Sequence, residues 1–283
     1  MASNSDPLSA SVDPLRVSYA TGRMLGVEDF QTEQTYHRGR LARVLSTALG
    51  SGTLSGLNVK TNGAAAPADI EIQVTPGIAI DRAGRIIDVP YQVCIRLDKY
   101  LQYADNKLKL LDAFQGGAIL ADVFVSFVAC DRGKTPCFAT MDDYDATDAF
   151  VPNRLLDSFT MLLVLRTDPN PKLPQDAWQK TTPLGPVAGD LNAQLETLKQ
   201  AMLEGNDAPS ISYPEYPPED KNFDRTSVFL ARLSIPATQE NAGDTPAYDL
   251  TKLAAENIDN LSRLFLYPGA LLARWAGLTT GGK

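Results

Sequence analysis

A chain of 283 residues with 44% hydrophobic and 21% charged residues has the composition of a soluble globular protein that can bury a sizeable core. Its formal net charge of −8 argues against a nucleic-acid-binding protein, because no basic face develops beyond Arg38, Arg40 and Arg43. No apolar stretch reaches about 18 residues, so the sequence predicts no membrane span.

The opening residues, MASNSDPLSASVDP, predict neither export nor a folded element. They lack the basic and apolar regions of a secretory signal peptide, and the odd count of three cysteines suits a reducing compartment. We therefore expect synthesis and assembly in the cytoplasm. Residues 1–22 are rich in Ser, Asp and Pro, and we expect them to form an extended N-terminal arm.

The next stretch, GVEDFQTEQTYHRGRLARVLSTALG (26–50), predicts a helix that ends at Gly50-Ser51-Gly52. Gly39 within it implies a close neighbour packed over that position, because glycine costs about 1 kcal/mol in a helix. One stripe recurs at steps of three and four residues, and we expect it to face the core. Its members are Phe30, Gln34, His37, Leu41, Val44 or Leu45, and Ala48.

Short alternating β segments follow this helix. They lie at residues 57–59, 70–74, 78–80, 86–89 and 93–97, with a bend at Thr75-Pro76-Gly77 and a hairpin loop at 81–84. Residues 23–97 are therefore predicted to form a helix plus β-hairpin module.

Residues 98–250 predict a mixed α/β core with long Pro-rich loops. Strong strands are expected at 121–130, 159–166 and 228–235, and the first should be central because both of its faces are apolar. Helices are expected at 98–114 and 187–204.

Residues 251–283 predict a C-terminal helix and an apolar tail. The helix should begin just before them, with Leu250, Leu253, Asn257, Leu261 and Leu264 on one side. The predicted fold class is α+β: the N-terminal helix plus β-hairpin module, then a mixed β-sheet with flanking helices and the C-terminal helix.

His37 is the only histidine, so a two-histidine metal site is excluded. Glu33, one helical turn earlier, could orient it as a general base. The plainer interpretation is a partly buried histidine on the core-facing stripe. Its neighbouring arginines would then hold carboxylates of a strand or a partner.

The three cysteines, Cys94, Cys130 and Cys137, do not have zinc-site spacing, and we interpret them as buried or half-buried thiols. Catalysis by Cys137 would need His37 across a large sequence separation. We expect no cofactor and no catalytic residue, because phosphate-loop, dinucleotide, serine-hydrolase and HExxH motifs are all missing.

An acidic loop, MDDYDATDAF, carries Asp142, Asp143, Asp145 and Asp148. The loop fails the EF-hand pattern, because Asp148 stands where glycine is required and Arg154 where the closing glutamate belongs. A looser calcium site and a solvated loop are both compatible with these residues.

The tail is too apolar for a free terminus. It either folds back on the core or docks on another subunit, because exposed apolar patches usually mark partners. The candidate partner-binding residues are Leu264, Phe265, Leu266, Tyr267, Leu271, Leu272 and Trp275.

Three consecutive sequence motifs carry a resemblance to a known family. GVEDFQTEQTYHRGR, SGTLSGLNV and IQVTPGIAIDRAGRIIDVP resemble the pattern DFxxEQxYHxxR, GxGxxxGLxV and PGxAIDxxGRxIxVP of bacterial proteins associated with phage-tail-like contractile injection systems. DVFVSFVACDRGKTP, VPNRLLDSFTMLLV and SVFLARLSI resemble later strands of that family. The resemblance runs from about residue 22 to 236, and no catalytic residue comes with it.

The resemblance implies a non-enzymatic structural subunit, either in the baseplate or as an adaptor at the cap end. Its partners would be sheath, tube, cap or baseplate proteins, and the family context implies a homo-oligomeric ring of six. One alternative is a glycan- or receptor-binding tail appendage that uses Tyr213, Tyr216 and Phe223 for stacking. The other is an enzyme built on His37 or Cys137.

Overall fold

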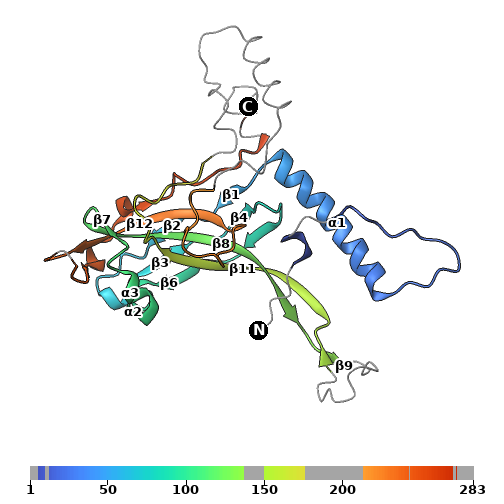
Figure 1. The fold of residues 1–283 in the computed structure, drawn as a ribbon, viewed down its shortest axis with the longest axis horizontal. Helices are drawn as coiled ribbons and strands as arrows, with labels where there is room; N and C mark the ends of the chain where they lie inside the picture. Colours follow the sequence, from blue (N-terminus) through green and yellow to red (C-terminus); the bar gives the residue numbers. More distant parts are fainter. Residues whose placement is uncertain are drawn as a thin grey trace, which may run out of the picture.

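The computed structural model describes residues 6–9, 13–136, 150–175, 213–241, 243–269 and Leu272. The α+β class is confirmed in these ranges, with strands as the larger part (Figure 1). The predicted helix at 187–204, the acidic loop at 142–148 and Cys137 lie outside the described residues.

Two small antiparallel sheets form the N-terminal module. One contains β1 (Gly52–Gly56), β4 (Gly77–Ile80) and β5 (Ile86–Val89), and the other contains β2 (Val59–Thr61), β3 (Glu71–Val74) and β6 (Val93–Arg96). The chain passes from one sheet to the other at Gly56, where φ is +64° and a Cβ would lie 2.1 Å from the Pro76 carbonyl oxygen. The predicted bend at 75–77 therefore lies beside Gly56. At this point both segments, β1 to β2 and β3 to β4, pass from one small sheet to the other.

The main sheet is built around β8 (Ala118–Arg132), which confirms the prediction of a central strand. β8 lies between β11 (Arg154–Leu165) and β12 (Val228–Thr238), and all of these pairings are antiparallel. Short strands extend it: β7 (Phe114–Gln115) pairs with β8, and β13 (Ala247–Tyr248) and β14 (Ile258–Asp259) pair with β12. At the far end of the β8–β11 hairpin, β9 (Thr135–Pro136) pairs with β10 (Phe150–Val151).

One hydrophobic core joins the small sheets to the main sheet. Ile72 and Ile87 from the small sheets share it with Val123, Leu230 and Leu233 of the main sheet, and all five are fully buried. Burial of such side chains is worth about 1.5–3 kcal/mol each. The N-terminal module is thus fixed rigidly to the rest of the protein.

The helix predicted at 98–114 is two short helices, α2 (Leu97–Gln102) and α3 (Ala104–Lys109). The chain turns extended at Tyr103 (ψ 136°), and the Asn106 side chain donates a hydrogen bond of 2.9 Å to the Tyr100 carbonyl. This break lets Leu110 and Ala113 reach the core, which a continuous helix would not allow.

The prediction of a helix around residues 250–264 is wrong. This segment forms the 3₁₀ turns η4 (Leu250–Lys252) and η5 (Ala255–Asn257) and then β14. The side chains of Asp249 and Asn257 accept hydrogen bonds from nearby backbone N–H groups, which favours turns over a helix. Two further 3₁₀ turns are η1 (Pro7–Ser9) and η2 (Pro67–Asp69).

Candidate interaction surface

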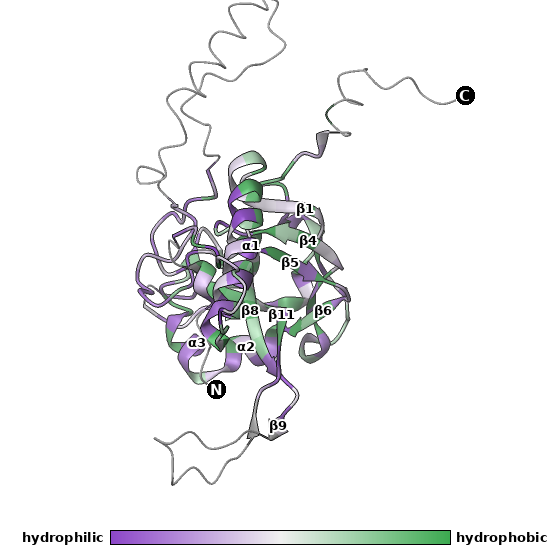
Figure 2. Cartoon of the chain, turned by 90° about the vertical axis from the view of Figure 1, so that its right-hand side faces the viewer, coloured by the Kyte–Doolittle hydropathy of each residue, from purple (hydrophilic) through white to green (hydrophobic). Residues whose placement is uncertain are grey.

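The long helix α1 (Val27–Ala48) lies on one side of the molecule, outside the sheets (Figures 1 and 2). Its backbone touches the body at the hairpin loop between β4 and β5. Gly84 has a φ of +81°, and a Cβ there would lie 1.9 Å from the Ala42 carbonyl oxygen. Only glycine fits this approach, so Gly84 sets how closely α1 docks.

Residues 6–9 form a second anchor between α1 and the body. The Asp6 carboxylate lies 3.2 Å from Arg38 Nη2 of the helix and 3.3 Å from Arg85 Nη1 of β4–β5. Leu8 covers Gly39, with 3.4 Å between Leu8 Cδ2 and the position of a Cβ. The expected close neighbour over Gly39 is therefore confirmed.

Hydrogen bonds to Asp81, at the other end of the β4–β5 loop, fix the position of Arg85. Its Nε donates a hydrogen bond of 2.6 Å to Asp81 Oδ2, and its backbone N–H donates to Asp81 Oδ1 at 2.9 Å. Arg85 Nη2 also reaches Thr226 Oγ1 at 2.7 Å, just before β12. The anchor of α1 is thus tied to the main sheet.

The apolar stripe of α1 faces solvent, so the prediction that it faces the core is wrong. Val27 begins the stripe, one turn before Phe30, and these two side chains are 67% and 56% exposed. Leu41 and Val44 are 56% and 61% exposed, and Gln34, His37 and Ala48 are exposed as well. We call these seven residues the outer stripe. The side toward the body carries small residues, including Thr32, Gly39, Ala42 and Ser46, together with Leu45, the alternative stripe member, which is half-buried.

His37 stands on this outer stripe with 69% of its side chain exposed, so its interpretation as a partly buried core histidine is wrong. The predicted partner is correct: His37 Nε2 lies 2.9 Å from Glu33 Oε1. The Tyr36 ring meets the imidazole edge-on at 5.4 Å between centroids. These contacts hold the side chain along an open helix face.

The tail folds back on β1 at its start. Residue 265 forms a parallel bridge with Thr53, whose N–H donates to the Leu264 carbonyl at 2.9 Å and whose carbonyl accepts from the Leu266 N–H at 2.8 Å. Leu266 is buried and Leu264 half-buried, whereas Phe265, Tyr267 and Leu272 are exposed. Leu271 and Trp275 lie outside the described residues, and partner binding by this tail stays a prediction.

The segment just before the tail is hydrogen-bonded to the N-terminal module. The Asn260 side chain makes hydrogen bonds with both the N–H (2.9 Å) and the carbonyl (2.8 Å) of Val59. Arg263 is buried and donates to the Leu57 carbonyl at 2.7 Å, and this burial lowers the pKa of Arg263 to about 10. Residues 258–266 thus act as part of the fold.

The aromatic residues that suggested glycan stacking are mostly interior. Tyr216 and Phe223 are buried with Phe124 and Phe229 in an aromatic cluster, and Tyr213 is half-buried beneath the Arg82 guanidinium, 3.3 Å from its ring centroid. The Tyr216 hydroxyl donates to the Ser227 carbonyl at 2.9 Å. Their contacts are those of a core, which removes the aromatic basis of the glycan-binding alternative.

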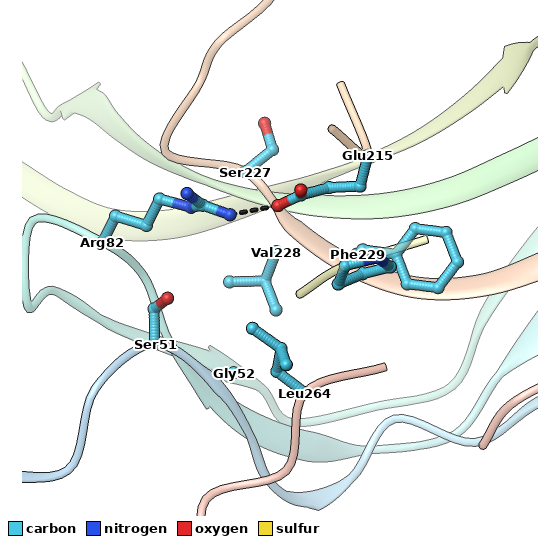
Figure 3. Close-up of a pocket in the computed structure, with 9 residues that line it drawn as sticks. Ser51, Gly52, Arg82, Glu215, Ser227, Val228, Phe229 and Leu264 are labelled. Carbon is cyan, nitrogen blue, oxygen red and sulfur yellow. Dashed lines mark hydrogen bonds and ion pairs between the residues drawn. The ribbon is translucent and has the colours of Figure 1, made fainter. Parts of the chain in front are cut away.

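A small pocket lies beside this cluster (Figure 3). Arg82 and Glu215 form an ion pair across it, and Ser51, Val228 and Leu264 help to line it. Burial raises the pKa of the Glu215 carboxyl, against the pull of Arg82. The cavity volume is about 10 Å³, which is what one water needs. The pocket therefore does not hold an organic substrate.

A buried ionic triad crosses the main sheet. Asp122 of β8 is fully buried between Arg166, 2.5 Å from its Oδ2, and Arg232 of β12, 2.8 Å from its Oδ1. Arg166 also donates to the Glu215 carbonyl at 2.6 Å and pairs with Asp168. Every charge is paired, which is the arrangement that makes buried ions tolerable. The triad therefore fixes the loop positions at Asp168 and Glu215 against the main sheet.

The structure describes two of the three cysteines, and one of them has the predicted environment. Cys130 is half-buried as expected, whereas Cys94 is exposed on the edge strand β6, against the prediction. In the ranges that the structure describes, no group of three His, Cys, Asp or Glu side chains could hold a metal ion. The helices of those ranges also include none that is long and apolar enough to cross a membrane.

Comparisons with known proteins add little. No protein-family model matches the chain, and no curated protein matches it. Among solved structures, the chain is similar to one described as "The baseplate complex from the type VI secretion system", with 12% identity and a TM-score of 0.28. The match covers 55% of this chain and 49% of that one, so the chain spans about half the neighbour's length. At this level of similarity the match assigns no function.

Proposed function

We propose that the chain is a structural subunit of a phage-tail-like contractile injection particle, where it acts without catalysis as an assembly or adaptor protein at the baseplate or cap end. The observation that carries this is the outer stripe of α1. Four large apolar side chains, each more than half exposed, share one face of a helix whose other face is anchored to the body. Such a face on a rigid support is typical of a subunit interface.

The residues that carry the family resemblance support the same role. Gly56 turns the corner between the two small sheets, Gly84 admits the backbone of α1, and the Asp81–Arg85 pair holds the loop that α1 touches. Each of these motif residues therefore serves to build the module that presents the helix. A catalytic motif would instead bring reactive groups together around a substrate-sized pocket.

The tail would extend this surface. Leu266 Cδ2 lies 3.9 Å from the position of a Cβ on Gly50, just past the end of α1. Its neighbours Phe265 and Tyr267 are 40% and 60% exposed. Under this proposal the partners are sheath, tube, cap or baseplate subunits, and the homo-oligomeric ring of six stays part of the proposal.

The test is incorporation into particles. In cells that carry the chain's own gene cluster, sedimented particles would be probed for the tagged chain and for its Leu41→Asp variant. We expect the native chain to co-sediment with sheath and tube proteins and Leu41→Asp to be depleted about tenfold or more.

Leu108→Asp is the matched control, because Leu108 is an exposed leucine on the short helix α3. It should co-sediment like the native chain. Absence of the native chain from sheath-containing particles would refute the proposal. Equal incorporation of Leu41→Asp would remove the outer stripe from it.

A further inference from the structure

We infer that the outer stripe of α1 pairs with the outer stripe of a second copy of this chain, with the two helices antiparallel. This inference names the partner of the proposed assembly surface and rests on that role for α1. It concerns contact between two copies only, so it can fail while incorporation into a particle holds, and the reverse is also possible.

The spacing of the outer stripe is that of a coiled-coil seam. Its seven positions, 27, 30, 34, 37, 41, 44 and 48, alternate in steps of three and four over the whole of α1. A helix of 22 residues is about 33 Å long, which is enough for three heptads. Because the body contacts the opposite side at Gly39 and Ala42, a second helix can approach the stripe along its length.

The order of residues along the stripe is nearly symmetric about its middle. In an antiparallel pair, Phe30 faces Leu41 of the second copy, and Val27 faces Val44 of the second copy. Gln34 then faces His37 of the second copy. Each half of the seam thus has two apolar layers outside a polar one, and the two halves repeat by two-fold symmetry. A polar layer at one point of a seam fixes its register.

Charge favours the antiparallel orientation over the parallel one. The first half of α1 carries Glu28, Asp29 and Glu33, and the second half carries Arg38, Arg40 and Arg43. A parallel pair would instead place Glu33 beside Arg38 of the second copy, an arginine that Asp6 of its own chain already pairs with. An antiparallel pair places each acidic half beside a basic half, with Glu33 next to Arg40 of the second copy, and also opposes the two helix dipoles.

Neighbouring residues are compatible with this pairing. Arg40 and Arg43 are exposed on α1. The extended segment before α1 meets the helix at the edge of the stripe, where the Val17 N–H donates to Glu33 Oε2 at 3.4 Å. Its exposed side chains Leu15 and Tyr19 would add apolar contact at the rim of the dimer.

The first experiment measures self-association of the purified full chain by analytical ultracentrifugation over a concentration series. We expect a monomer–dimer equilibrium, and a dissociation constant raised about a hundredfold or more by Phe30→Asp or Leu41→Asp, since each change alters two symmetric sites. Leu108→Asp should leave the constant unchanged. Circular dichroism and urea unfolding at low concentration show that each variant is folded.

The second experiment tests orientation by disulfide cross-linking. In a background with Cys94→Ser, Cys130→Ser and Cys137→Ser, chains with Val27→Cys are mixed with chains with Val44→Cys. We expect a covalent dimer from the mixture and none from either chain alone. Glu33→Arg alone should weaken the dimer several-fold, and Glu33→Arg with Arg40→Glu should restore it, because the charge pair is exchanged.

Three results would overturn the inference. One is a chain that stays monomeric at all concentrations, and another is a dimer that survives both Phe30→Asp and Leu41→Asp. The third is cross-linking of a single cysteine variant with itself, which would mean a parallel pair. If the chain is monomeric and Leu41→Asp still abolishes incorporation into particles, another subunit covers the stripe. The proposed function would then stand without the dimer.

Discussion

α1 and β8 both carry strong apolar patterns, but the structure covers only one of them. Residues 121–127 of β8 are all buried, whereas Ala42 is the one buried side chain among the 22 residues of α1. An apolar pattern shows that a face must be covered. It does not show whether the cover comes from the same chain or from another.

The difference lies in what surrounds each element. On one face of β8, Val123 and Val125 join the core shared with the small sheets, and on the other Phe124 joins the aromatic cluster. β11 and β12 satisfy both of its edges. α1 instead meets the body through backbone, small side chains and the half-buried Leu45, so the large apolar residues of the outer stripe are left outside.

The largest expected effect compares a truncation in each element. Phe124→Ala should lower the free energy of unfolding by about 3–5 kcal/mol, because it leaves a cavity inside the aromatic cluster. Leu41→Ala should change it by no more than about 0.5 kcal/mol in the monomer. Urea unfolding at low concentration measures both. A Leu41→Ala loss as large as that of Phe124→Ala would mean that the outer stripe is covered within one chain.

The second prediction separates the two parts of the tail. Ending the chain after Asn260 removes Arg263 and Leu266, which bind the Leu57 carbonyl and bury against β1, so we expect a loss of about 3 kcal/mol or more. Ending it after Tyr267 keeps these contacts. Thermal and urea unfolding of the two shortened chains should therefore differ clearly, and equal stability would show that residues 261–267 do not support the fold.

Much of this fold could be predicted from local patterns. Alternation located the β segments, and the two-sided apolar run of 121–130 identified the central strand β8. The bend at 75–77 and the close neighbour of Gly39 also followed from local rules, because proline and glycine restrict the backbone directly.

Other features could not be predicted from the spacing of apolar residues alone. The apolar spacing at 250–264 fitted a helix, but the side chains of Asp249 and Asn257 stabilise turns. The pairing of Asp122 with Arg166 and Arg232 joins residues that lie 44 and 110 positions apart in the sequence.

The candidate surface was predicted in part. The prediction of an apolar stripe on α1 was correct, but the prediction that the stripe faces the core was wrong. Periodicity gives the spacing of the residues on a helix face and does not show what covers that face. One signal was present in the sequence: the opposite side of the helix carries Thr32, Gly39, Ala42 and Ser46, which suit close packing on a backbone.

The third prediction concerns the docking of α1. Gly84→Ala should lower the free energy of unfolding by about 2 kcal/mol or more, because the new Cβ would meet the Ala42 carbonyl at 1.9 Å and φ is +81°. Gly63→Ala is the control, since φ is +65° there and nothing lies within 4 Å of a Cβ. It should cost only the conformational strain, about 1 kcal/mol. Equal losses in urea unfolding would show that close docking of α1 adds nothing to stability.

The smallest predicted effect is a change with pH. Tyr100 donates a hydrogen bond to the Leu163 carbonyl of β11, and burial raises the pKa of Tyr100 from 10.0 to about 12. Tyr100→Phe should cost about 1 kcal/mol at neutral pH. The folded state keeps the Tyr100 proton up to a higher pH than the unfolded state does. The stabilisation that the Tyr100 hydroxyl contributes is therefore complete below pH 10 and is lost as the pH rises toward 12.

The difference between the native chain and Tyr100→Phe should therefore shrink between pH 10 and pH 12, as measured by urea unfolding at each pH. Tyr103→Phe, an exposed tyrosine in the same segment, controls for the loss of a hydroxyl. Burial also raises the pKa of Tyr216, so part of the alkaline decline should remain in Tyr100→Phe. A difference that stays constant across this range would mean that the Tyr100 hydroxyl of α2 is not buried against β11.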